Sequence, residues 1–433
     1  MKEKVKINLV WLRRDLRLYD NMALYHALKH KANVQLIFIF DSYILSDLEA
    51  DDKRLNFIYQ VLVKIQKSLA KYNASLCIKK GKPLEVFKNL SEKYTIENIY
   101  CNHDYEPYAL KRDETVKEFA KSHDIGFHSF KDQVIFEKND IVKPDGLAYT
   151  VFTPYAKKWL KQLAQTPIKS VNCTPLFSNL YKSNDFDFPE AQSIGIKKAS
   201  FNYPEPVLNK DVIKNYNLFR DYPAMEGTSR LGIHFRFGSI SIREAVIFAQ
   251  KHSPVWLNEL IWREFFMMIL FHYPYVVDQP FKKKYNKLPW LYDDILFEKW
   301  TKGETGYPLV DAGMRELVAT GFMHNRVRMV TASFLTKHLL HDWRLGEAFF
   351  AKHLLDYELS SNNGNWQWAA GTGCDAMPYF RIFNPMQQAK KFDKKHTYIS
   401  KWVPEFNSNT YAKAVIEHKY ARERAIKTFT SIQ

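Results

Sequence analysis

The first third of the chain alternates short apolar runs with longer amphipathic stretches, and this pattern restricts the fold more than any other feature. The runs cover residues 5–11, 34–40, 74–78 and 98–101, and stretches with helical periodicity, such as residues 56–72, separate them. Consecutive apolar positions indicate strands buried on both faces, which requires helices on both sides of a parallel sheet. We therefore predict an α/β domain with a Rossmann-like parallel sheet over residues 1–130.

The pattern changes twice further along the chain. Residues 131–209 are rich in Pro, Asn, Ser and Lys, which predicts an extended connector with the entrance of a helix at residues 149–155. Beyond residue 210 the periodicity is helical almost throughout. We expect an all-helical domain over residues 210–433, with its clearest helices at residues 241–251, 255–271, 310–320, 325–341 and 345–355.

The composition indicates a folded protein with an anionic partner. Hydrophobic residues make up 46% of the 433 residues, and 63 Lys and Arg against 47 Asp and Glu give a net charge of +16. Such an excess favours a polyanion such as nucleic acid, although a solubilising surface charge is the alternative. No G-x-G-x-x-G motif follows the first apolar run, so dinucleotide binding is not predicted there.

The four cysteines are scattered without a C-x-x-C pair, which indicates neither a disulfide framework nor a metal site. The first residues contain no apolar signal core, and no uninterrupted apolar run of about 18 residues occurs in the sequence. We expect a cytoplasmic protein that does not enter a membrane.

Residues 358–373 combine an Asn-Asn-Gly turn with two tryptophans, Trp366 and Trp368. On a helix, two positions turn a side chain through about 200°, so the two rings are expected to face opposite sides. Taken alone, the segment reads as two large anchors at the start of a helix capped by Asn.

Glu259 and Trp262 share one face of the helix predicted over residues 255–271. A carboxylate beside an indole is unusual in a protein core, and an ion pair with Arg263 at i+4 is the structural alternative. The polar turn at residues 226–231 could hold a diphosphate through backbone N–H groups, or could simply cap a helix.

Together these segments resemble the photolyase and cryptochrome flavoproteins. Glu259-Leu-Ile-Trp-Arg-Glu264, Met323-His-Asn-Arg-Val-Arg-Met329 and residues 358–373 follow one another in the order and spacing of that family. The similarity extends from residues 10–17 to residues 416–422 and is greatest to class I cyclobutane pyrimidine dimer photolyases. It implies a monomer that uses light and fully reduced FAD to repair pyrimidine dimers in DNA.

The resemblance also assigns roles to individual residues. Gly232 stands where a serine is common, and Glu358 stands where the family usually has Asp. The implied FAD contacts are Tyr216, Thr228, Ser229, Arg230, Leu231, Gly232, Arg263, Arg328, Asp356, Glu358 and Asn362.

A second implied set contacts DNA and the lesion. Glu259 would hydrogen-bond the flipped dimer as a catalytic residue, and two indoles would stack on it. The implied DNA and lesion contacts are Arg220, Glu259, Trp262, Asn325, Arg326, Met329 and Trp368. A third set, Trp366, Trp343 and Trp290, matches the electron chain of the family, with Trp366 nearest the flavin.

Three other functions are alternatives to the repair of cyclobutane dimers. Asn362 and the short C-terminal end favour a repair enzyme over a cryptochrome photoreceptor, whose plant and insect members carry Asp and Cys at this position. A six-four photoproduct photolyase requires His where this chain has Asn325, and His324 is one residue away. A non-enzymatic flavoprotein that binds nucleic acid is a further possibility.

The resemblance also bears on a second, light-harvesting pigment in the N-terminal domain. Tyr108 and Ala109 replace the Asn and Glu of folate-binding members. Residues 41–45, Arg13 and residues 106–108 are more similar to members that hold a deazaflavin or a second flavin. An empty cleft is the alternative.

Overall fold

The computed structural model describes residues 3–182, 186–197 and 201–432. The chain forms two compact units that interleave along the sequence. The first comprises Met1–Glu137, Leu163–Val207 and Arg230–Phe248, and the second comprises Lys138–Gln162, Leu208–Ser229 and Ala249–Gln433. No helix among the described residues is both long and apolar enough to span a bilayer.

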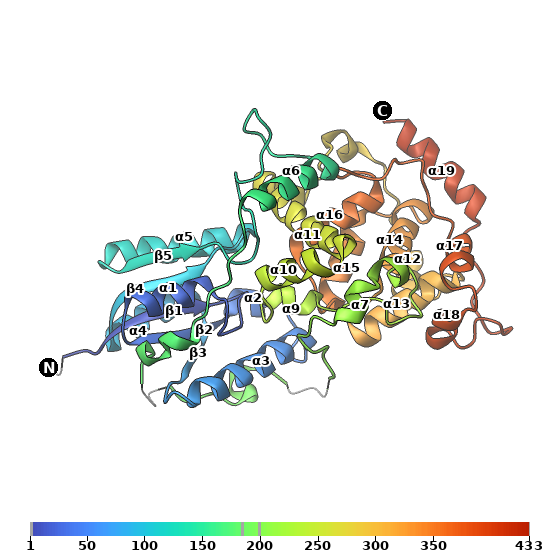
Figure 1. Ribbon diagram of the computed structural model, residues 1–433. Coiled ribbons are helices and arrows are strands. Elements are labelled where there is room, and N and C mark those ends of the chain that lie inside the picture. Colours follow the sequence, from blue (N-terminus) through green and yellow to red (C-terminus); the bar gives the residue numbers. More distant parts are fainter. Residues whose placement is uncertain (1–2, 183–185, 198–200, 433) are drawn as a thin grey trace. The chain divides into compact units, whose positions relative to one another are not determined.

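The first unit is built on a parallel sheet of five strands in the order β3-β2-β1-β4-β5 (Figure 1). In the central strand β1, Ile7, Leu9 and Trp11 pack on one face while Val10 and Leu12 pack on the other. The strands are β1 (Lys6–Leu12), β2 (Val34–Asp41), β3 (Leu76–Gly81), β4 (Thr95–Asn102) and β5 (Gly126–Phe130). The predicted α/β class is therefore confirmed.

Helices cover both faces of this sheet, as continuous burial of the central strands requires. Side chains of α1 and α3 pack on the Val10 face, and those of α4 and α5 pack on the Trp11 face. The helices of this region are α1 (Met22–His30), α2 (Ser42–Leu45), α3 (Lys53–Ala70), α4 (Pro83–Lys93), α5 (Pro107–Ser122) and α9 (Gly232–Phe237).

Two helices run across the division between the units, α6 (Phe152–Gln165) and α10 (Ile242–His252). The predicted connector, residues 131–209, contains α6 and the 3₁₀ turns η1 (Thr174–Asn179) and η2 (Ala191–Ile194). Its residues 183–185 and 198–200 lie outside the described residues.

The second unit is helical, as predicted. Pro254 and the Ser253 cap begin α11, whereas Gly321 and Gly371 end α13 and α16 at positive φ of 68° and 82°. Its helices are α7 (Lys210–Lys214), α8 (Tyr216–Phe219), α11 (Pro254–His272), α12 (Asp294–Lys302), α13 (Pro308–Thr320), α14 (Asn325–Ser333), α15 (Trp343–His353), α16 (Leu359–Ala370), α17 (Pro385–Phe392), α18 (Thr397–Trp402) and α19 (His418–Thr430), with 3₁₀ turns η3 (Pro274–Val277) and η4 (Lys283–Lys287).

Two local predictions are wrong. The helix expected over residues 325–341 changes after α14 into a wider π-helical turn, η5 (Phe334–His338), and Leu340 then adopts a positive φ of 56°. The Asn362-Asn-Gly364 segment is no turn at a helix start, because it lies inside α16, whose N-cap is Glu358.

Gly364 lies inside α16 at the point where α11 approaches this helix closely, and a larger residue would not fit there. A Cβ atom at this position would lie 2.2 Å from Cδ1 of Phe266 on α11. Gly346 on α15 is in the same situation, because its Cβ atom would lie 2.1 Å from Cη2 of Trp366. Two glycines thus allow α16 to pack tightly against α11 and α15.

We predict that Gly364→Ala destabilises the protein although alanine is the better helix former. Overpacking of a filled core costs about 1–3 kcal/mol, which exceeds the gain of about 1 kcal/mol from helix propensity. Urea or thermal unfolding measures the difference. Asn365→Ala, at an exposed position of the same helix, is the control and should stay within about 0.5 kcal/mol of the wild type. Equal stability of Gly364→Ala and the wild type would contradict the close contact.

Candidate functional site

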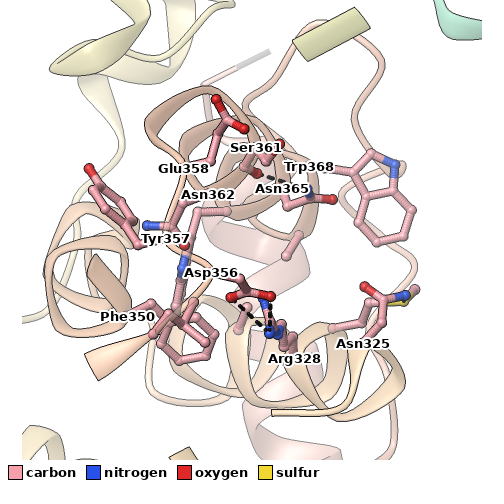
Figure 2. Close-up of a pocket in the computed structure, with 15 residues that line it drawn as sticks. Asn325, Arg328, Phe350, Asp356, Tyr357, Glu358, Ser361, Asn362, Asn365 and Trp368 are labelled. Atoms are coloured by element: carbon pink, nitrogen blue, oxygen red, sulfur yellow. Dashed lines mark hydrogen bonds and ion pairs between the residues drawn. The ribbon is translucent and has the colours of Figure 1, made fainter. Parts of the chain in front are cut away.

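The second unit contains a pocket of about 100 Å³ lined by three helices and the loop before α16 (Figure 2). Ser361, Asn362, Asn365, Trp366 and Ala369 reach it from one face of α16, since they recur at intervals of three and four residues. The other lining residues are Asn325, Arg328, Met329 and Ala332 of α14, Phe350 of α15, and Leu354, Asp356, Tyr357, Glu358 and Trp368.

The structure therefore brings together eight of the residues singled out in the sequence. They are Asn325, Arg328, Met329, Asp356, Glu358, Asn362, Trp366 and Trp368. The two tryptophans both line the pocket, although their spacing predicts opposite directions. Ser361 and Asn365 were missed, but their spacing from Asn362 and Trp366 on the same helix would have identified them.

Two residues of the pocket lining, Arg328 and Asp356, form an ion pair. Nη2 of Arg328 lies 3.0 and 3.2 Å from the two carboxylate oxygens of Asp356, and its Nε donates to the carbonyl of Met323 at 2.7 Å. Both partners keep about a quarter of their side-chain surface exposed. The guanidinium is thus fixed in orientation and still accessible to a ligand.

Asn362 is oriented by Glu347. Its amide nitrogen donates to the carbonyl oxygen of Glu347 at 3.0 Å and to its carboxylate at 2.8 Å. Because the nitrogen is engaged in this way, the amide oxygen is the polar atom that Asn362 offers to a ligand. Burial raises the pKa of Glu347, and the hydrogen bond from Asn362 acts in the opposite direction.

A second charged cluster involves α8 and α11. The carboxylate of Glu259 pairs with Nη1 of Arg220 at 2.6 Å, and the Arg220 guanidinium lies 5.0 Å from the centre of the Tyr216 ring. The local pair of Glu259 with Arg263 does not form, since Arg263 contacts Glu358 at 3.4 Å. Glu259 and Arg263 are thereby committed to different partners.

Arg326 has an analogous partner. Its Nη2 lies 2.7 Å from Asp221, and its guanidinium lies 4.4 Å from the centre of the Phe392 ring. Arg326 does not line the pocket. Consecutive residues, Arg220 and Asp221, thus hold Glu259 and Arg326.

Trp262 lies outside the pocket lining and packs face to face on Phe152, with ring centres 3.6 Å apart and planes 6° apart. Phe266 packs close by, with ring centres 5.5 Å apart. One face of this indole is therefore covered by the protein, and a ligand could stack only on what remains.

The three tryptophans of the predicted chain belong to one hydrophobic cluster. Trp366 and Trp343 are only 2% and 1% exposed, whereas Trp290 is partly buried at the edge of the cluster. Trp290 is therefore the member of the series that reaches solvent.

The predicted diphosphate motif spans the division between the units. Thr228 and Ser229 belong to the second unit, while Arg230, Leu231 and Gly232 belong to the first. Arg230 has a positive φ of 51°, and Gly232 begins α9. Participation of the five residues in one site stays a prediction.

In the first unit, aromatic side chains gather after β2 and β4. The rings of Tyr43 and Tyr108 stack with centres 4.4 Å apart, and Tyr108 donates its hydroxyl proton to Asp41 at 2.6 Å. Tyr43 is 58% exposed, and the guanidinium of Arg112 lies 5.8 Å from the Tyr108 ring centre. This flat aromatic surface is suited to a planar ring, whereas the guanidinium of Arg112 is already paired with Asp113 at 2.9 Å.

The pocket on α16 fits a flavin. Phe350, Trp366 and Ala369 supply apolar wall, while the Arg328–Asp356 pair and the amide of Asn362 supply polar groups for the edge of a ring system. Such a pocket beside a buried tryptophan cluster is chemically suited to a redox-active flavin, so the class of protein that it indicates is a flavoprotein.

Sequence comparison agrees with this class. Residues 8–173 match the profile of DNA photolyase, and residues 256–430 match the FAD binding domain of DNA photolyase. A deoxyribodipyrimidine photo-lyase of Alkalihalophilus pseudofirmus is 37% identical over 92% of this chain and 87% of its own length. That of Salmonella typhimurium is 35% identical over 98% of both chains. The chain belongs to the DNA photolyase family.

Solved structures are similar over nearly the full length. A bacterial class III photolyase from Agrobacterium tumefaciens has a TM-score of 0.87 at 29% identity, covering 100% of this chain and 98% of its own. An archaeal photolyase from Sulfolobus tokodaii with two FAD molecules has 0.80 at 29%, covering 99% and 100%. A cryptochrome from Synechocystis has 0.86 at 25%, with the same coverage.

The Arg220–Glu259 pair predicts a pH-dependent loss of stability in Arg220→Gln. Burial already raises the pKa of Glu259 above its ordinary value of 4.5, and Arg220 opposes this effect. Without Arg220 the native carboxyl binds its proton still more tightly than the unfolded one, so the free energy of unfolding falls as pH rises above about 4.5. Arg220→Gln should match the wild type in Tm near pH 4.5 and melt several degrees lower at pH 8.

The matched control is Arg220→Gln combined with Glu259→Gln, which removes the titrating group. Its Tm difference from Glu259→Gln should not depend on pH. A pH-independent loss in the single variant would show that Arg220 acts only through packing.

Proposed function

We propose that the protein is a light-driven repair enzyme that splits cyclobutane pyrimidine dimers in DNA. The observation that carries the proposal is the convergence of Asn362, Trp366, Asn325 and Trp368 on one pocket. The first two stand at flavin positions of the family and the last two at lesion positions. Relatives named deoxyribodipyrimidine photo-lyase support the same activity.

FAD, when bound and fully reduced, supplies the light-excited electron that opens the cyclobutane ring. The residues of this chain prepare the site for it. Arg328, held by Asp356, gives the ring system a fixed cation, and the amide oxygen of Asn362 can accept a hydrogen bond from a ring N–H. An acceptor at that position favours a reduced, protonated ring.

The lesion is held by stacking and by one carboxylate. Trp368 and the part of the Trp262 ring that Phe152 and Phe266 leave uncovered would supply aromatic platforms for a flipped dinucleotide. Stacking on these rings would replace the base stacking that the dinucleotide loses when it leaves the duplex. Glu259, half-buried and paired with Arg220, would hydrogen-bond the dimer as negative charge develops on it.

Phosphate binding would involve exchange of ion pairs. Arg220 and Arg326 are each paired with a carboxylate in the protein alone, at 2.6 and 2.7 Å. Arg326 would exchange Asp221 for a phosphate, and water weakens this pair because Asp221 keeps 41% of its side-chain surface exposed. The net charge of +16 supplies the long-range attraction.

The six-four photoproduct alternative is disfavoured by the position of His324. This side chain is 3% exposed, and its Nδ1 accepts a hydrogen bond from the backbone N–H of Arg326 as the N-cap of α14. It therefore serves the helix, and Asn325 occupies the pocket in its place. Asn362 disfavours a cryptochrome photoreceptor, the other alternative.

The stacked pair Tyr43 and Tyr108 supports an antenna pigment of the deazaflavin or flavin type in the first unit. The exposed aromatic surface suits a planar ring. Folate is disfavoured because Tyr108 uses its hydroxyl on Asp41 and Ala109 is buried.

We predict that Trp366→Phe separates electron supply from repair. Phenylalanine keeps most of the packing in the buried cluster but is much harder to oxidise, so electrons can no longer be relayed inward from Trp290 and Trp343. Blue-light reduction of oxidised FAD with an external reductant should be lost. Dimer splitting after reduction by dithionite should be retained, because the repair electron starts from the flavin and returns to it.

Flavin absorbance and dimer loss are measured on the same preparation, with Trp300→Phe as the control for removal of a buried indole from the same cluster. Normal photoreduction in Trp366→Phe would refute the relay. Loss of repair with fully reduced, bound FAD would show that Trp366 has another function.

A further inference from the structure

The segment around Trp290 presents an unusual apolar surface to solvent. Leu291, Tyr292 and Ile295 are 42%, 70% and 68% exposed, and we call these three side chains the apolar patch. They follow directly on Trp290, which packs with Phe429 at 6.0 Å between ring centres. The most accessible tryptophan of the predicted electron chain is therefore continuous in sequence with the patch.

Four lysines precede this patch in the chain, at positions 282, 283, 284 and 287, and all four are exposed. None of them forms a salt bridge with a carboxylate in the part of the chain that the structure describes. The ammonium groups of Lys283 and Lys284 lie over the rings of Tyr275 and Tyr285, at 5.6 and 5.3 Å from the ring centres. Their positive charge is thus held in place without being neutralised.

Two exposed acidic residues, Asp293 and Asp294, offset part of this charge, and four lysines against two carboxylates leave residues 282–295 at +2. Asp293 is the N-cap of α12, where its carboxylate accepts a hydrogen bond from the N–H of Leu296 at 3.0 Å. Asp294 lies in the first turn of the same helix. Both carboxylates therefore face the positive end of the helix dipole.

An apolar centre beside unpaired cations favours a protein partner over nucleic acid. Phosphates require cations but gain nothing from the exposed aliphatic side chains of Leu291 and Ile295, whereas weak electron-transfer complexes have small contacts with complementary charges. The lysines require the partner to be acidic. The adjacent indole of Trp290 belongs to the predicted electron chain, so the partner would deliver an electron.

We propose that the apolar patch and the four lysines form the docking site of an acidic one-electron-transfer protein that reduces Trp290 after its oxidation. The proposal rests on the proposed function, because Trp290 must be the outer end of the electron chain. One electron leaves the reduced metal or flavin of the partner, which is oxidised by one unit. The Trp290 radical cation gains that electron and becomes a neutral indole, and no bond is formed or broken.

Reduced plastocyanin, an acidic cuprous protein, is a suitable probe because its oxidation to the blue cupric form is visible. A laser flash on the protein with oxidised FAD generates the tryptophan radical, and the decay of the radical is followed as plastocyanin is added. Radical decay and blue colour should appear together, with a second-order rate constant that falls as salt is added.

The test variant reverses three charges, Lys283→Glu, Lys284→Glu and Lys287→Glu. We expect it to lower the plastocyanin rate constant at low salt by about tenfold or more. Tyr292→Ser with Ile295→Ser should lower it several-fold at all salt concentrations. The rate with dithiothreitol, an uncharged small reductant, should be unchanged in both variants.

The matched control carries the same change in net charge on the first unit, Lys67→Glu, Lys71→Glu and Lys93→Glu, at exposed positions. An equal loss in this control, or no loss in the test variant, would reject the docking site. If the test variant instead flattens the salt dependence of duplex DNA binding by about three phosphates, the lysines belong to a DNA face and the proposal is wrong.

Failure of the electron chain is recognised separately. If Trp290→Phe leaves radical formation and its decay with dithiothreitol unchanged, Trp290 is not the outer donor. The proposed docking site is then refuted as well. If Trp290→Phe abolishes that decay while the lysine variant reacts normally with plastocyanin, the predicted electron chain is supported and only the docking site is refuted.

Discussion

Close packing of α16 between α11 and α15 is the constraint on which the candidate site depends. Gly364 leaves room for Phe266 on one side, and Gly346 leaves room for Trp366 on the other. A side chain at either glycine would push α16 outward, and Asn362 and Trp366 would move with it. Since these two residues reach the pocket from the same helix, its position decides both the polar edge and the apolar wall of the site.

Charged residues around the site are almost all paired before any ligand arrives. Arg328 with Asp356, Arg220 with Glu259 and Arg326 with Asp221 are each fixed within 3.0 Å. Paired side chains lose less conformational freedom on binding than free ones, which lowers the cost of recognising a flavin or a phosphate. The same pairs keep a half-buried carboxylate such as Glu259 from being left without compensation.

The sequence predicted the architecture better than the local details. Four of the five strands were found because their apolar runs are buried, whereas Gly126–Phe130 was missed because this edge strand is only half-buried and has no such run. The domain boundaries stay a prediction, although the described chain interleaves two units. The segment at Asn362 was read as a turn because Asn and Gly favour turns, but tertiary packing at Gly364 outweighed that preference.

For the site, too, the sequence predicted groupings within one helix but not contacts between distant segments. Residues within one helix, such as Asn325, Arg328 and Met329, were grouped by their spacing, and all three line the pocket. Contacts between distant parts of the chain were not accessible from the sequence: Glu259 pairs with Arg220 rather than with Arg263, and Trp262 stacks on Phe152. The roles carried over from the family, including those of Thr228 and Ser229, rest on resemblance until they are tested.

The most direct test of the account is repair of defined lesions under controlled light. The protein with fully reduced FAD is incubated with an oligonucleotide that contains one thymine cyclobutane dimer, and a second oligonucleotide carries a six-four photoproduct. Near-ultraviolet light should remove the cyclobutane dimer, and neither darkness nor the six-four substrate should give any product. Persistence of the dimer in the light with FAD bound and reduced, or repair of the six-four lesion, would contradict the assignment of this pocket.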